Sequence, residues 1–377
     1  MRKRDLSGGL ILAMGLAACA PAPEETPPPT AKPAPPPRVL STEPIPASNT
    51  DREALRSTAR RLAGLPVEAA DPAAPEAEAW ARHAESMEAM WTELEARHLS
   101  KMRHWAATDL TLADPPAPLF YPFSGPDLPS ALQFFPQASS YVLVGLELPG
   151  KIPDLGALGI AELEVELERL RTGLANLVEA GYFVTKRMET DFVAPHLDGV
   201  LPVLYLFLAR AGLDPQAVQF ISLDAQGHEE PLESASETTA TAVRIDLAGE
   251  PARSVYYFAR DLSNAGLAAA PAFEAFLGRL GAFNVYMKSA SYLLHMDDFT
   301  QFKAMLLATA DAVLQDDSGL PIRDLSPDVW ETQLLGTYTG TLPTYREWQQ
   351  DDLVARYEQV ETSPLPFAIG YNSRIAG

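Results

Sequence analysis

Cysteine is almost absent from this sequence: its 377 residues include one, Cys19. No disulfide can form within the chain, and thiol catalysis is excluded. Positive charge is also scarce, because 29 lysine and arginine residues face 50 acidic residues and the formal net charge is −21. Such a balance repels phosphate backbones, so we expect no binding to nucleic acid.

Long hydrophobic runs are missing too. Residues 6–16 form an apolar stretch that falls short of the ~17 to 25 residues a membrane-spanning helix needs. This stretch follows Arg2, Lys3 and Arg4, a combination typical of a secretory signal peptide. We therefore expect residues 1–18 to be a signal peptide and not a transmembrane helix.

The signal-like stretch ends in LAAC at residues 16–19, which resembles the lipobox of bacterial lipoproteins. The resemblance implies that Cys19 is lipidated, becomes the mature N-terminus and holds the protein at a membrane through acyl chains. The alternative is a chance cysteine after an ordinary secretory signal. Ala20 follows, where in similar enteric lipoproteins an aspartate favours inner-membrane retention, so we expect a cell-envelope protein at the outer membrane.

Catalytic motifs are lacking as well. The chain has no GxSxG and no SxxK, which removes the common serine-nucleophile signatures of the cell envelope. It has no HExxH, and its six histidines show no pairing at metal-ligand spacing, so we expect no metal site. The GxGxxG motif of dinucleotide-binding proteins is absent too.

Proline, by contrast, is abundant, with 34 residues in the chain. Residues 19–50 contain many of them, and such a stretch prefers extended polyproline II geometry and cannot build a core. We interpret it as a spacer, although a proline-rich segment can also dock SH3-like partners.

Residues 51–114 have a helical pattern. One helix is predicted to reach about Gly64, and a longer one carries an apolar stripe from Trp80 to Trp105 at spacings of three and four. His98 lies in this stripe, either as a ligand or as a hydrogen-bonded core residue. The two other histidines here, His83 and His104, fall off the stripe, so we expect them to be solvated.

Residues 115–329 alternate short apolar strands with amphipathic helices. This pattern predicts an α/β fold with a mixed, mainly parallel Rossmann-like sheet, preceded by the N-terminal helical segment. We also predict helices around residues 163–177, 273–280 and 299–313 and a buried helix at 200–209. The candidate strands are residues 119–123, 141–147, 182–186, 218–223, 242–247, 255–260 and 283–288.

Three further segments complete the organisation. Residues 225–241 are polar and acidic and are predicted to form a solvated loop. The sequence DDSG at 316–319 lacks the spacing of a calcium loop, so we interpret it as a helix stop with Gly319 as the left-handed cap. Residues 330–377 are predicted to be a C-terminal extension that packs on the domain.

The sequence around Gly125 has the order strand, tight turn, short helix, strand and acidic residue. Class I methyltransferases and dinucleotide-binding domains use this form, with a glycine in the turn and a carboxylate after the second strand that binds ribose hydroxyls. Gly125 would be the turn and Glu147 the carboxylate, with Ser124 and Asp127 beside the turn. The alternative is a Rossmann-like sheet without a cofactor, and we expect none to be bound.

A second group of polar residues follows two later strands. Asp261 and Asn264 come after one, and Lys288 and His295 after the next. Ligands in open α/β sheets bind beyond the carboxyl ends of the strands, so this group is a candidate site in a crevice. In such a site Lys288 would be an electrophile or an anion clamp, and Asp261 a base or a ligand acceptor. Alternatively, Asp261 and Asn264 cap a turn, and Lys288 pairs with an acidic neighbour.

Several short stretches resemble an uncharacterised family of bacterial lipoproteins. They read YPFSGPD, FFP, VGLE, KSASYLLH and QDDSG, and the resemblance covers about residues 98 to 370. It implies no activity, because no function is established for the family. We expect a non-catalytic protein that binds a small molecule or an envelope protein; the alternatives are a transferase- or hydrolase-like envelope enzyme and a degenerate methyltransferase-like fold.

Overall fold

The computed structural model describes residues 49–68, 71, 73–110, 117–183, 195–232, 240–338, 340–360 and 368–374. The chain divides into two units, residues 1–36 and 37–377, and all described residues belong to the second. Cys19, the predicted signal peptide and the proline-rich segment up to residue 48 lie outside the described residues. Within these ranges, no helix has both the length and the apolar character to cross a membrane.

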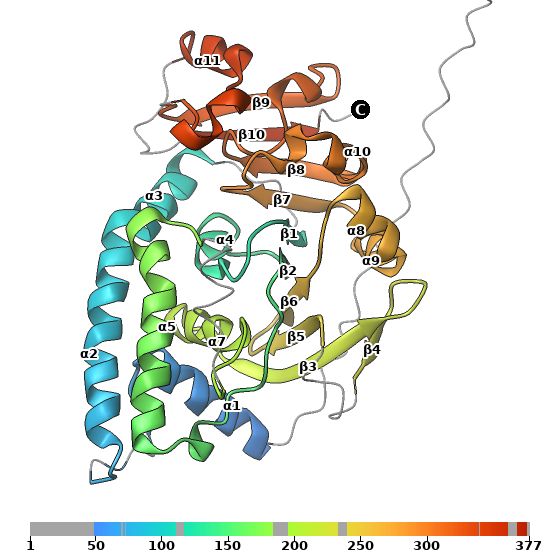
Figure 1. Ribbon diagram of the computed structural model, residues 1–377. Coiled ribbons are helices and arrows are strands. Elements are labelled where there is room, and N and C mark those ends of the chain that lie inside the picture. The colour runs from blue at the N-terminus through green and yellow to red at the C-terminus, as the bar shows by residue number, and fades with distance from the viewer. Residues whose placement is uncertain are drawn as a thin grey trace, which may run out of the picture. The chain divides into compact units, whose positions relative to one another are not determined.

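A ten-stranded mixed sheet forms the centre of this second unit (Figure 1). Its strands are β1 (Leu119–Tyr121), β2 (Ser140–Gly145), β3 (Pro215–Leu223), β4 (Glu229–Pro231), β5 (Ala242–Leu247), β6 (Arg253–Ala259), β7 (Phe283–Met287), β8 (Ala310–Gln315), β9 (Trp330–Gly336) and β10 (Ala368–Arg374). They lie in the order β4-β3-β5-β6-β2-β1-β7-β8-β10-β9. The predicted α/β class with a mixed sheet is therefore confirmed.

The middle of the sheet is parallel. Strands β6, β2, β1, β7 and β8 pair with one another in parallel, whereas the pairs outside this group are antiparallel. From β1 the chain proceeds to β2 and then β6 in one direction, and later through β7 and β8 in the other. The order thus reverses between β1 and β7, which is where open α/β sheets bind ligands.

Helices cover both faces of the sheet (Figure 1). One group contains α1 (Asn49–Leu62), α2 (Ala77–Leu94), α3 (Ser100–Asp109), α4 (Leu128–Phe134), α5 (Ile160–Ala180) and α7 (Leu201–Arg210), and α2 runs beside α5. The other contains α8 (Asn264–Ala269), α9 (Pro271–Arg279) and α10 (Thr300–Thr309), while α11 (Asp351–Tyr357) lies near the C-terminus.

Alternating strand residues feed two separate cores. On β1, Leu119 and Tyr121 belong to the core under the first helix group, whereas Phe120 belongs to the core under the second. Side chains of successive strand residues point to opposite faces, so a sheet covered on both sides must be apolar throughout. Each large apolar side chain that is removed from water contributes roughly 1.5–3 kcal/mol to the stability of the fold. The two cores therefore fix the positions of the strands and of the residues that follow them.

The predicted helical patterns are largely confirmed. The 200–209 pattern forms α7, of which all but Arg210 is buried. The stripe from Trp80 to Trp105 runs along α2 and α3, with a π-helical turn, η1 (Glu95–Leu99), between them that the spacing did not predict.

The helix-stop interpretation of DDSG is wrong. Helix α10 ends at Thr309, and residues 310–315, predicted to be helical up to Val313, form strand β8. Asp316 and Asp317 therefore follow a parallel strand at the ligand-binding edge, and Gly319 is not among the glycines with positive φ. No glycine or proline separates α10 from β8, which is why the apolar spacing ran on as one helix.

Three other predictions need correction. His83 is fully buried, with Nε2 2.9 Å from the Leu62 carbonyl, because α2 is covered on this side as well. Part of the predicted 225–241 loop is strand β4, and residues 233–239 lie outside the described ranges. Residues 182 and 183 are not a strand, and 184–186 are not described.

Candidate functional site

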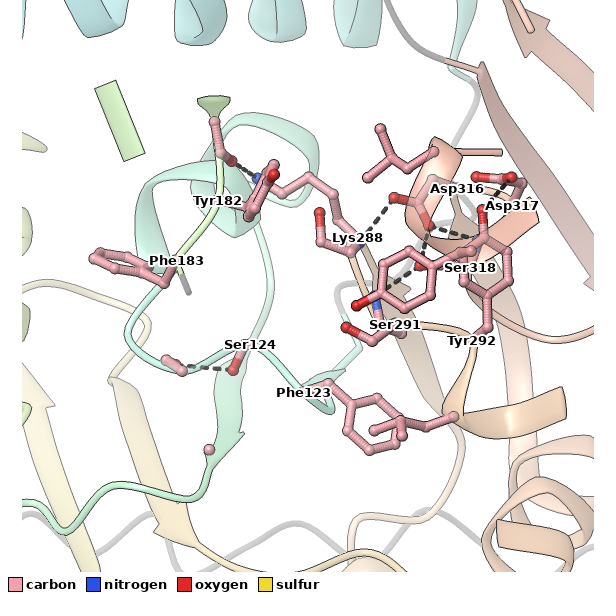
Figure 2. Close-up of a pocket in the computed structure, with 18 of the residues that line it drawn as sticks. Phe123, Ser124, Tyr182, Phe183, Lys288, Ser291, Tyr292, Asp316, Asp317 and Ser318 are labelled. Atoms are coloured by element: carbon pink, nitrogen blue, oxygen red, sulfur yellow. Dashed lines mark hydrogen bonds between the residues drawn. The ribbon is translucent and has the colours of Figure 1, made fainter. Parts of the chain in front are cut away.

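A cavity of about 820 Å³ opens at the carboxyl ends of the parallel strands. Its volume lies within the ~300–1,000 Å³ typical of small-molecule sites. Figure 2 shows Tyr182 and Phe183 on one side of it and Tyr292 and Asp317 on the other. The polar side chains that line it after the strands include Ser124, Glu147, Arg260, Asp261, Lys288, Ser289, Ser291, Asp316, Asp317 and Ser318.

Backbone strain is concentrated at this cavity. Among the described residues, the non-glycine positions with positive φ are Phe123, Ser289, Ser291 and Tyr292, with φ between 53° and 59°. All four line the cavity. Such conformations cost roughly 1–3 kcal/mol each and persist where the surrounding structure imposes them, often at ligand sites.

The turn after β1 folds back onto β2. The backbone amides of Ser124 and Gly125 both donate to the Val144 carbonyl, at 2.8 and 3.2 Å. Gly125 has a φ of 52°, as its predicted place in a tight turn requires. A Cβ atom on Gly145 would lie 3.0 Å from the Gly125 Cα, so this cavity wall depends on two glycine backbones in close approach.

Asp127 lies beneath this turn and not in the cavity lining. Its carboxylate accepts a hydrogen bond from the Tyr121 hydroxyl at 2.9 Å and from the Ser130 backbone amide at 3.4 Å, which caps α4. The start of α4 therefore already holds a carboxylate of the protein itself. A ligand pyrophosphate, which dinucleotide-binding domains place at this helix, would meet the capping carboxylate of Asp127 instead of free amides.

Lys288 holds the end of β7 to its surroundings. Its Nζ lies 2.7 Å from Asp127 Oδ2, and it donates to the Gly181 carbonyl at 2.5 Å and to Ser130 Oγ at 2.9 Å. Both members of the ion pair are largely buried. The alternative in which Lys288 pairs with an acidic residue therefore describes the structure better than an anion clamp does.

Glu147 and Asp261 line the cavity at the ends of β2 and β6. The Tyr257 hydroxyl donates to the Glu147 carbonyl at 2.8 Å, which fixes the backbone beyond β2. The Asp261 carboxylate accepts from the Ser263 amide and hydroxyl at 2.8 and 2.9 Å, and Ser263 caps α8. Asp261 thus combines the turn-capping role of the alternative interpretation with a place on the cavity wall.

Asp316 and Asp317 form the wall that follows β8. Asp316 accepts from the Ser289 amide at 2.8 Å and from the Ser318 hydroxyl at 2.6 Å, and burial raises its pKa. Asp317 accepts from the hydroxyls of Tyr292 and Tyr338 at 2.6 and 3.2 Å. Burial, opposed in part by the Tyr292 hydrogen bond and assisted by the charge of Asp316, raises the pKa of Asp317 to about 6.

Two histidines lie near this edge. His98, in the π-helical turn, lines the cavity, and its Nε2 is 3.1 Å from the Val178 carbonyl, while burial lowers its pKa. His295 lies outside the lining, with Nε2 3.0 Å from the Gly319 carbonyl and its ring against Tyr292 and Trp348. Burial lowers the pKa of His295 to about 4, so it is neutral near pH 7.

The sequence therefore placed part of the cavity. Of its candidates, Ser124, Gly125, Glu147, Asp261 and Lys288 line the cavity, whereas Asp127, Asn264 and His295 do not. The Asn264 amide instead binds the Asp297 carbonyl and Thr300 Oγ1, both at 3.0 Å. The lining residues that sequence reasoning missed include Arg260, Asp316 and Asp317. Arg260 was taken as the last residue of a predicted strand, and the two aspartates followed a segment that was predicted to be helical.

Comparisons with known proteins give no relative: no protein-family model, curated protein or solved structure matches this chain. Within the part of the chain that the structure describes, no three histidine, cysteine, aspartate or glutamate side chains come together as a metal site would require.

Proposed function

We propose that this protein is a lipid-anchored binding protein of the cell envelope whose crevice takes a small molecule that contains a nucleoside. The observation that carries this proposal is the cavity itself. It lies where the strand order reverses, it is lined by residues that follow β1, β2, β6, β7 and β8, and its wall contains all four strained non-glycine positions of the described chain.

The strand order supports a nucleoside ligand. Setting aside β3, β4 and β5, which extend the sheet beyond β6, the remaining strands numbered along the chain lie in the order 3-2-1-4-5-7-6. The seventh is antiparallel to both of its neighbours. This is the topology of class I methyltransferases, which bind a nucleoside cofactor at the ends of the first strands. The shared strand order supports the location of a ligand site, whereas the type of ligand must be argued from the residues at that site.

The chemistry of the wall supports the same class. Glu147, two residues after β2, offers carboxylate oxygens where such folds bind ribose hydroxyls, and Asp261 offers another carboxylate after β6. Tyr182 and Phe183 supply aromatic surface across the cavity from the tyrosines of the C-terminal half. Asp127 at the start of α4 disfavours a dinucleotide, so a single nucleoside fits better.

A second candidate function is an envelope transferase. The observation that favours it is Asp317, a carboxylate with a pKa of about 6 on the cavity wall. Such a group can accept a proton from a bound substrate near neutral pH. The sequence suggested Lys288 as an electrophile, but its ammonium group is paired with Asp127 and is therefore not available to a substrate.

Calorimetric titration of the purified protein with adenosine and S-adenosylhomocysteine tests the proposal. We expect both to bind, and Glu147→Gln to weaken both about tenfold, because a hydrogen bond from a ligand to a charged acceptor is replaced by a neutral one. Glu85→Gln, a change at an exposed residue of α2, is the matched control and should bind as the unchanged protein does. If neither adenosine nor S-adenosylhomocysteine binds, the proposal is contradicted.

A further inference from the structure

We infer that Arg260 binds an anionic group of the ligand, and that the ligand of the crevice is a nucleoside monophosphate. This inference rests on the proposed binding of a nucleoside and adds the ligand's charge and the residue that recognises it.

Arg260 is held at the end of the sheet where a ribose is expected. It follows β6 directly, and its backbone amide donates to the Gly145 carbonyl at 2.8 Å, which ties it to the end of β2. Its side chain lines the same cavity as Glu147. Arg260 and Glu147 thus line one cavity from the ends of two adjacent strands.

Among the described residues, no carboxylate pairs with the Arg260 guanidinium. Its Nε is buried and makes no hydrogen bond to any described residue. No carboxylate within the described ranges lies within 4.0 Å of it. Burial without compensation lowers the pKa of Arg260 and makes the charged form costly to hold there.

The other basic groups of the cavity are already engaged. Lys288 is paired with Asp127, and the His98 ring nitrogen Nε2 is bonded to the Val178 carbonyl. Elsewhere in the fold, the buried Arg244 is matched by Asp246 and Glu229. Within the described ranges these other buried cations are paired, whereas Arg260 lines a cavity without such a partner, which points to an anion supplied by a ligand.

The neighbouring carboxylate narrows the class of anion. Glu147 lines the same cavity, and a carboxylate accepts hydrogen bonds from the hydroxyl groups of a ligand. A ribose that bears one phosphate offers hydroxyl groups to Glu147 and two phosphate oxygens to the guanidinium. The planar guanidinium binds such oxygens through two parallel hydrogen bonds. A nucleoside monophosphate satisfies both side chains.

The test compares ligands that differ by one phosphate. Adenosine, its 2′-, 3′- and 5′-monophosphates and inorganic phosphate are titrated into the full chain by calorimetry. We expect at least one monophosphate to bind about tenfold or more tightly than adenosine, since one charge-assisted pair is added. In Arg260→Gln this advantage should disappear while adenosine binds as before, and Arg52→Gln, at an exposed residue of α1, should keep it.

Each outcome separates the two proposals. If adenosine and its phosphates all fail to bind, the nucleoside proposal is wrong and this inference falls with it. If adenosine binds but no monophosphate binds more tightly, or Arg260→Gln keeps the advantage, only the inference about Arg260 is overturned. If inorganic phosphate binds as tightly as the best monophosphate, the anion site is real but the nucleotide class is wrong. Should Arg260→Gln unfold, Arg260→Lys keeps the charge without the planar fork and should lose most of the advantage.

Discussion

The two ends of the crevice differ in whether their charged side chains have partners within the protein. At the β7–β8 end, Lys288, Asp316 and Asp317 are each held by hydrogen bonds or an ion pair from the protein. At the β2–β6 end, the Arg260 guanidinium has a buried nitrogen with no partner among the described residues. The charges of the first end are therefore paired within the protein, whereas in the inference above the Arg260 guanidinium finds its partner in the ligand.

This contrast separates residues that shape the site from residues that recognise the ligand. Changes at the β7–β8 end should lower the stability of the protein, because each removes a partner from a buried polar group. Changes at Arg260 should alter affinity and leave stability nearly as it was. The predictions below test that division, beginning with the largest expected effect.

Lys288→Met should destabilise the protein most, by ~3–5 kcal/mol, because it leaves Asp127 buried without its cation. Chemical denaturation of the variant measures this loss. Lys303→Met is the matched control, since Lys303 pairs with Asp324 nearer the surface and should cost no more than ~1 kcal/mol. Equal losses in the two variants would show that the β7–β8 end is not a stabilising network.

Asp317 should make stability depend on pH. Its pKa is about 6 in the fold against 3.8 as the reference value, so the folded state binds more protons between these values. The contribution of protonated Asp317 to the free energy of unfolding is therefore fully present below about pH 4. It is lost as the pH rises through 6, which lowers the free energy of unfolding by up to ~3 kcal/mol. Asp317→Asn should remove this decline, as denaturation at pH 4 and pH 7 would show.

An unchanged decline in Asp317→Asn would assign the pH dependence to other groups, of which Asp316 is the first to examine because burial raises its pKa as well. Tyr338→Phe offers a milder probe. It removes the longer of the two hydroxyl bonds to the Asp317 carboxylate and should raise that pKa further, which moves the decline to higher pH.

Arg260→Gln should change the free energy of unfolding by less than ~1 kcal/mol in the absence of ligand, and it could even stabilise the protein, because an unpaired buried charge is removed. Thermal melts with and without a binding monophosphate measure both effects. A loss as large as that expected for Lys288→Met would mean that the two ends do not differ in kind.

The sequence located strands and helices better than it located the contacts between them. The turn at Gly125 and the carboxylate at Glu147 were predictable because they follow directly from one strand-turn-helix-strand pattern. The ion pair of Asp127 with Lys288 joins residues far apart in the chain, and it required knowing that β1 and β7 are neighbours. Local patterns carry no information about such pairing.

The missed wall at Asp316 and Asp317 has a local cause. The apolar spacing from Phe302 to Val313 is compatible with one helix, and no glycine or proline interrupts it at Thr309. The change from helix to strand there depends on burial against β7 and β10, which overrides the helical spacing. Two acidic residues after a strand then became, in the sequence interpretation, a helix end.

The smallest expected effect on the crevice is that of Cys19→Ala. If the chain is anchored by an acyl group on this residue, the variant should lose fatty-acid labelling and leave the membrane fraction. Its melting temperature and its affinity for adenosine should not change, because the described residues that line the cavity all lie beyond position 97. Continued labelling of the alanine variant would contradict the proposed anchor. A change in affinity would show instead that the anchor and the crevice are coupled. Residues outside the two ends of the cavity would then also affect how the ligand is bound.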